Sequence, residues 1–230
     1  SLALMDARNH TLQLLACYEE AIRAGLRTPR GADVEPAARI AGQVAWLTER
    51  WIGRNPQRGL GPKSPADGVC LPSLHPEADL WFGPYGRGPW PGLDEVRAYM
   101  LGQLESTLDL LERVDETDDG LYLFRAMLHH EDLRGEQMVV QAQALGLYLP
   151  LPPGAAHGAR DPLYLPATRW RLGSAPDGFV PALERPQHWV DVPALEIDAQ
   201  PVTWAQYIEF VDDGGYDRPE LWHPQGWDWL

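Results

Sequence analysis

Apolar residues recur at helical spacing in four segments of the first 145 residues, and this pattern limits the fold more than any other feature of the chain. The four segments are 2–24, 36–54, 93–114 and 118–145. In the second segment, Ile40, Val44 and Leu47 would share one face of a helix, with polar residues on the other faces. Such helices are stable when their apolar faces meet, so the sequence predicts an antiparallel four-helix bundle.

A stretch rich in Pro and Gly, residues 55–92, separates the second and third segments. A loop of this length inside a compact domain usually has a function. It contains Arg87 between two glycines, close to Trp81, Tyr85 and Trp90. We predict that Arg87 binds a substrate carboxylate, since loops on a rigid scaffold carry many binding residues. The alternative is an exposed loop whose aromatic residues pack on a second domain.

The character of the chain changes after Tyr148. Residues 148–166 are rich in Pro, Gly and Ala and are expected to form a linker. Short β-like pieces at 169–172, 189–192 and 194–198 and an amphipathic helix at 203–212 follow. The predicted class is therefore α+β, with a bundle at 1–147 and a second domain at 167–230. That second domain is small for an independent core, so we expect it to be the start of a larger one.

Composition excludes some classes of function. The net charge of −14 argues against nucleic acid as a partner, because binding phosphates requires a basic face. No apolar run is long enough to cross a bilayer. Two cysteines form no disulfide framework, which favours a reducing cytoplasm. Because Ser1 is not an initiator methionine, we expect a partial chain; the oligomeric state is left open.

The segment Leu128–Glu136 contains most of a metal-binding motif inside the fourth predicted helix. His130 and Arg134 are one helical turn apart, so their side chains leave the same face. A histidine at position 134 would complete H-x-x-x-H, the spacing at which two imidazoles share one metal ion. A guanidinium has no lone pair to donate, so Arg134 cannot be a ligand.

Two metal-free interpretations of this helix remain open. His130, Arg134, Gln137 and Gln141 lie on one stripe, which could be a structural polar seam with Arg134 paired to Glu49, Asp132 or Glu136. Alternatively the stripe could line a substrate pocket. Arg134 would then hold a carboxylate in a bidentate fork, and Gln43 would donate a hydrogen bond beside it.

Two groups of residues resemble one protein family. Gly42–Trp46, Trp51–Pro56 and Leu128–Glu136 resemble the DinB-like four-helix bundle of the ergothioneine-type sulfoxide synthases, especially the bacterial branch that includes selenoneine synthases. Pro201–Tyr216, Arg218–Trp222 and Gly226–Leu230 are similar to the opening of the formylglycine-generating-enzyme-like (C-type-lectin-like) domain that follows the bundle in that family.

The resemblance implies an oxygen-dependent, non-heme iron(II) oxidoreductase that forms a C–S or C–Se bond. Its substrates would be a histidine betaine and a thiol or selenol donor. Three histidines hold the iron in the family, and the corresponding positions here are Gln43, His130 and Arg134. Only His130 is a histidine. The family usually has asparagine at the position of Trp204, and its C-terminal catalytic residues would lie beyond Leu230.

Three hypotheses follow. In the first, the chain is an iron enzyme in which other side chains replace the missing ligands, and His75, His129, Glu131 and Glu136 were considered for that role. In the second, it is a degenerate relative that binds no iron and acts as a binding or partner protein, or as a metal-free enzyme. The third is a bundle acting alone like a thiol transferase, which the attached second domain disfavours.

Overall fold

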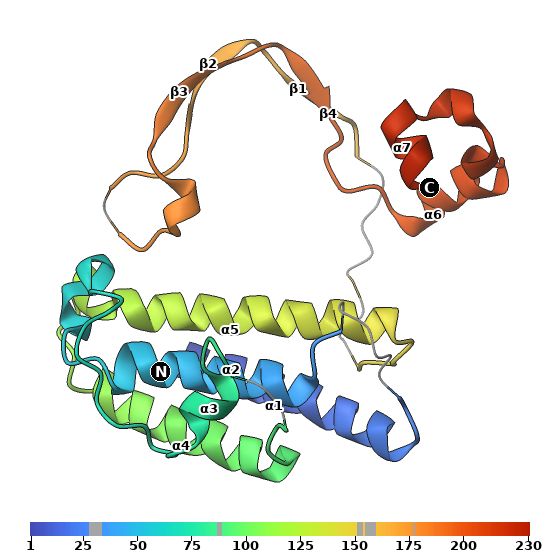
Figure 1. Cartoon of the computed structure of the whole chain (residues 1–230). Coiled ribbons are helices and arrows are strands. Elements are labelled where there is room, and N and C mark those ends of the chain that lie inside the picture. The colour runs from blue at the N-terminus through green and yellow to red at the C-terminus, as the bar shows by residue number, and fades with distance from the viewer. Residues whose placement is uncertain (28–33, 87–88, 151–153, 155–159, 177) are drawn as a thin grey trace. The chain divides into compact units, whose positions relative to one another are not determined.

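The computed structural model describes residues 1–27, 34–86, 89–150, 154, 160–176 and 178–230 (Figure 1). The chain forms two compact units. One comprises Ser1–Pro152 with Ala175–Arg185, and the other comprises Pro153–Ser174 with Pro186–Leu230. Among the described residues, no helix is both long and apolar enough to cross a membrane.

Four long helices run side by side in the first unit, as the apolar spacing predicted (Figure 1). They are α1 (Leu2–Arg23), α2 (Ala37–Thr48), α4 (Leu93–Leu111) and α5 (Asp118–Ala144). Helix α2 continues into a π-helical turn, η1 (Glu49–Gly53). Helix α5 begins where the Thr117 hydroxyl accepts a hydrogen bond from the Gly120 amide at 3.0 Å, which satisfies one of the free amides of the first turn.

The apolar faces of these helices form the core of the first unit. Its fully buried members include Leu15, Ile40, Val44 and Met100. Burial of such side chains is the main favourable term in folding. A buried ion pair joins α1 to α5 within this core: Arg8 Nε donates to Glu131 Oε1 at 2.7 Å, and the two side chains are 1% and 3% exposed.

The Pro- and Gly-rich stretch is more structured than the sequence predicted. It contains two short helices, η2 (Arg58–Lys63) and α3 (Ala78–Phe82). Both arginine terminal nitrogens of Arg54 donate to the Asp79 carboxylate, at 2.6 and 3.0 Å. These contacts tie the stretch to the bundle. No periodicity signals helices this short, since their stability comes from tertiary contacts.

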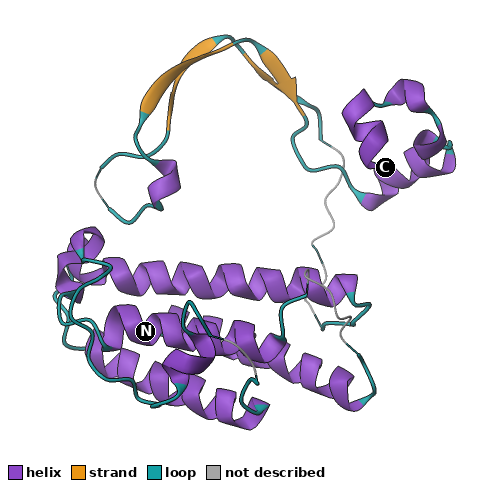
Figure 2. Cartoon of the chain, viewed as in Figure 1, coloured by secondary structure: helices purple, strands orange, loops and turns teal. Residues whose placement is uncertain are grey.

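The second unit contains two small antiparallel sheets and several short helices (Figure 2). Strand β1 (Leu163–Leu165) pairs with β4 (Leu195–Ile197), and β2 (Thr168–Leu172) pairs with β3 (His188–Val192). Helices α6 (Trp204–Asp212) and α7 (Pro224–Trp229) follow. The three later strands and α6 were predicted. Strand β1 lies within 148–166, the stretch that was expected to be a linker. A three-residue strand has no visible sequence pattern, because it depends on its distant partner.

Burial in this unit is slight. Among its described residues only Gly215 is buried, where an added side chain would overlap the ring of Phe210. Helix α6 is well specified locally, since Thr203 and Gln206 form a reciprocal capping box. The mixture of helices and strands agrees with an α+β class, while the DinB-like and lectin-like assignments and their boundaries stay predictions.

Candidate functional site

The polar stripe of α5 faces the start of α2, and Arg134 lies at its centre. Arg134 Nη2 donates to Glu35 Oε2 at 2.8 Å and to Gln43 Oε1 at 3.0 Å. Arg134 Nη1 donates to Gln137 Oε1 at 2.6 Å. The structure therefore brings Arg134 and Gln43 into direct contact, and the contact joins two residues that are 91 positions apart.

Glu35 is a member of this site that the sequence analysis missed. Its backbone amide donates to Gln141 Oε1 at 2.8 Å, and Gln141 Nε2 donates to the Glu35 carbonyl at 3.1 Å. Its carboxylate also accepts from Gln137 and lies 3.4 Å from Arg39 Nε. Glu35 is thus a fixed counter-ion for Arg134, and each side chain is 17% exposed.

The ion-pair partners predicted for Arg134 were wrong. The Glu49 carboxylate accepts from Tyr99 and Ser73 instead. Glu35 precedes α2 and belongs to no periodic segment, so no pattern placed it opposite α5. Proximity in the sequence had favoured Asp132 and Glu136, but both are exposed.

His130 has a buried nitrogen with no partner. Among the described atoms, Nε2 of His130 and Nε of Arg134 are both buried without a hydrogen bond. Burial lowers the pKa of His130, and the positive charge of Arg134 lowers it further. The imidazole is therefore neutral near pH 7, one helical turn from a guanidinium that has a free Nε donor.

These residues do not fit an iron(II) ion. A divalent non-heme site needs several lone-pair donors around open positions. Of the three positions that the resemblance assigns, only His130 has a ligand atom that is not engaged by the protein, because the Gln43 oxygen accepts from the Arg134 guanidinium and Arg134 itself is a cation. Within the described ranges, no group of three or more His, Cys, Asp or Glu side chains could hold a metal.

The four side chains considered as replacement iron ligands are not placed to bind a metal ion beside His130. Glu131 is engaged by Arg8 through both carboxylate oxygens. His129 and Glu136 are exposed side chains of α5. His75 lies 3.4 Å from Glu95 and contacts Trp81, away from the polar stripe.

Two arginines, Arg87 and Arg134, were predicted to bind a substrate carboxylate. Arg87 lies outside the described residues, so its role stays a prediction. Arg134 Nη2 already donates to two acceptors, and a bidentate fork through this atom would have to displace Glu35 or Gln43. Arg134 Nε and His130 Nε2 are the atoms of these two side chains that are buried without a hydrogen-bond partner in the described structure.

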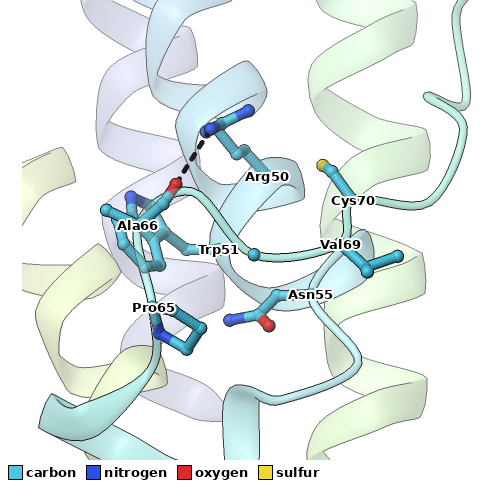
Figure 3. A pocket seen from close by; sticks show the side chains of 8 residues that line it. Arg50, Trp51, Asn55, Pro65, Ala66, Val69 and Cys70 are labelled. Carbon is cyan, nitrogen blue, oxygen red and sulfur yellow. Dashed lines mark hydrogen bonds between the residues drawn. The ribbon is translucent and has the colours of Figure 1, made fainter.

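A separate pocket between η1 and the following loop is too small for a substrate (Figure 3). Its volume is about 20 Å³, which is enough for about one water molecule. Arg50 Nη2 donates to the Ala66 carbonyl at 3.2 Å across it (Figure 3). This pocket is a detail of loop packing.

The chain is similar to three curated proteins named hercynine oxygenase. It is 36% identical over 150 residues to the protein of Mycolicibacterium smegmatis. The aligned region covers 58% of this chain and 33% of that protein. It is 30% identical over 235 residues to the protein of Mycolicibacterium thermoresistibile, and the aligned region covers 97% of this chain and 50% of that protein. It is 34% identical over 143 residues to the protein of Mycobacterium tuberculosis, and the aligned region covers 57% of this chain and 33% of that protein.

The chain therefore spans half or less of the length of these relatives. No family model matches it. The similarities support a broad relationship to the hercynine oxygenases.

Proposed function

We propose that this chain is a relative of the hercynine oxygenases whose bundle binds a histidine betaine at the Arg134–His130 site without an iron ion. One observation carries the proposal: Arg134 Nε and His130 Nε2 are buried, unpartnered and one helical turn apart. An unsatisfied buried polar atom costs about 1–3 kcal/mol. A ligand that bonds to both atoms would remove that cost.

The chemistry of the two atoms selects the ligand group. Arg134 Nε is a permanent donor, and neutral His130 donates from Nε2 when its proton is on that nitrogen. Two donors one helical turn apart, one of them charged, suit a carboxylate group. A histidine betaine such as hercynine has a carboxylate, and the names of the relatives make this compound the first to test.

A second candidate function is the iron(II)- and oxygen-dependent formation of a C–S or C–Se bond between hercynine and a thiol or selenol donor. The neutral, buried and free Nε2 of His130 favours it, because this is the state that a metal ligand requires. The side chains at positions 43 and 134 disfavour it. We assign no step of this reaction to the bundle.

Calorimetric titration with hercynine tests the proposal. Hercynine should bind the chain, and Arg134→Met should weaken binding by about tenfold or more, equivalent to about 1.4 kcal/mol. Arg125→Met is the matched control, since it removes a partly exposed arginine of the same helix that pairs with Asp118. The ligand control is the decarboxylated analogue of hercynine. Equal affinity for hercynine and this analogue would reject the carboxylate assignment.

A further inference from the structure

A groove on the bundle is separate from the Arg134 site. It lies between the loop that precedes α3 and the first half of α4, and its volume is about 390 Å³. Its lining residues are Leu74, His75, Glu95, Ala98, Tyr99, Gly102 and Gln103. Ala98 and Gly102 leave its floor open, and an added Cβ at Gly102 would meet nothing within 4 Å. The groove can therefore hold a small molecule.

The charge at the rim of the groove is negative. Glu95 is half-exposed, and its carboxylate lies 3.4 Å from His75 Nε2. His75 Nδ1 accepts a hydrogen bond from the Glu77 amide at 3.3 Å, so the ring proton is on Nε2 and points toward Glu95. Neither Lys nor Arg is among the residues that line the groove.

A second carboxylate lies buried directly behind the groove wall. Glu49 is 2% exposed and accepts from Tyr99 Oη at 2.5 Å, from Ser73 Oγ at 2.8 Å and from the Leu74 amide. All three donors are neutral, and no cation within the described chain forms an ion pair with Glu49. Arg54 forms its ion pair with Asp79, although its charge also attracts Glu49 at longer range.

This arrangement leaves the wall of the groove electronegative. A buried carboxylate without a direct ion-pair partner is only partly compensated by neutral hydrogen-bond donors and a more distant cation. Burial and Glu49 both raise the pKa of Tyr99 far above its usual value, so its hydroxyl stays protonated and continues to donate. A positive charge in the groove would be attracted by Glu49 and by Glu95 together.

Two of the residues that line the groove, His75 and Tyr99, have aromatic rings. The His75 ring lies 4.6 Å from the ring of Trp81 and 6.3 Å from that of Tyr99, measured between centroids. The face of a tyrosine ring attracts ammonium groups within about 6 Å, most strongly when the cation is partly desolvated. Trp81 contacts His75 but does not line the groove. A metal ion is a poorer fit, since no group of three metal-ligating side chains occurs in the described part of the chain.

We propose that this groove binds a small organic cation, with its ammonium group between Glu95 and the rings of His75 and Tyr99 and its apolar body over Ala98 and Gly102. The inference does not depend on the function proposed for Arg134. The two sites use different residues, and a titration can distinguish them.

An NMR titration of amide shifts with choline tests the groove, with 3,3-dimethylbutan-1-ol as its neutral isostere. Choline should shift the amides of residues 74–75 and 95–103, and the isostere should bind roughly threefold to tenfold more weakly. Equal affinity for the two compounds, no binding, or shifts confined to another region would overturn the proposal.

Three variants locate the binding. Glu95→Gln should weaken choline binding roughly threefold to tenfold, whereas Glu105→Gln removes the same charge from an exposed position of α4 and should leave it unchanged. Gly102→Leu should block the groove. Arg134→Met should leave choline binding intact even if hercynine binding is lost. A groove that tolerates both Glu95→Gln and Gly102→Leu is not the binding site.

Discussion

Arg134 of α5 and Glu35, two residues ahead of α2, form an ion pair with 2.8 Å between Nη2 and Oε2. The same Nη2 atom donates to Gln43. A cation of the protein itself therefore occupies the place where the family resemblance expects a metal ligand. Because the carboxylate that balances this cation is supplied by Glu35, the two helices are joined here without a metal ion.

Metal content distinguishes the iron-free interpretation from the iron enzyme. After anaerobic loading with iron(II) and desalting, the chain should retain far less than one iron per chain, measured by plasma mass spectrometry. The double variant Gln43→His, Arg134→His should approach one, since three imidazoles would then meet. Gln143→His, an exposed position on α5, is the control. Stoichiometric iron in the unaltered chain would reject the iron-free interpretation.

The ion pair should contribute measurably to stability. Glu35→Gln keeps the shape of the side chain but leaves Arg134 without its counter-ion, and we expect the free energy of unfolding to fall by about 1–3 kcal/mol. The exposed pair between Arg125 and Asp118 is the control, and Asp118→Asn should cost less than about 1 kcal/mol. Urea unfolding measures both. Equal costs for the two variants would mean that the Glu35 pair is no more than a surface contact.

The predicted parts of this site were those set by helical geometry. His130, Arg134 and Gln137 lie on one stripe of α5 because of their spacing, and the sequence contained that information. Glu35 was missed because its position depends on how the segment before α2 meets α5, which are joined through Gln141. Contacts of this kind depend on tertiary packing, and no local pattern encodes them.

His130 should make the stability of the chain depend on pH. Burial, with help from Arg134, holds the pKa of His130 below its usual value near 6.5. The unfolded chain therefore binds this proton more readily than the folded chain. The contribution of neutral His130 to the free energy of unfolding is fully present above pH 6.5 and is lost as the pH falls below that value. His130→Gln should flatten that slope, whereas His129→Gln, at an exposed neighbour, should not. Thermal unfolding between pH 5 and 7.5 measures the slopes.

Removing one partner of the buried pair between Arg8 and Glu131 should be the most damaging polar substitution in the bundle. Arg8→Met leaves Glu131 buried without a cation, and we expect a loss of about 3–5 kcal/mol. Adding Glu131→Leu removes the stranded charge, so the double variant should regain much of that loss. A double-mutant cycle measures the coupling. Additive losses would show that the two side chains stabilise the fold independently.

Dependence on tertiary packing also explains why some elements of the fold were not predicted from the sequence. Four long helices were predictable because each buries a face that recurs along the sequence. Helix α3 and strand β1 are too short to show such a pattern, and each is fixed by a distant partner, Asp79 of α3 by Arg54 and Leu163 of β1 by Ile197.

Two glycines on neighbouring helices should respond to alanine in opposite directions. At Gly42 of α2, an added Cβ would overlap the ring of Phe82, which is 1% exposed and has little room to move. At Gly102 of α4, an added Cβ meets nothing within 4 Å. Packing therefore dominates at the first position, and the intrinsic helix preference of alanine over glycine dominates at the second.

Gly42→Ala should lower the free energy of unfolding by about 1–3 kcal/mol, the usual cost of overpacking a core. Gly102→Ala should raise it by about 0.5–1 kcal/mol, because alanine loses less backbone entropy than glycine in a helix. Urea unfolding of both variants gives the two signs. A stable Gly42→Ala variant would mean that Phe82 can leave its place over α2. Since α3 is held there through Phe82 and Asp79, the stretch around His75 would then be free to move as well, and the cation groove would lose its fixed wall.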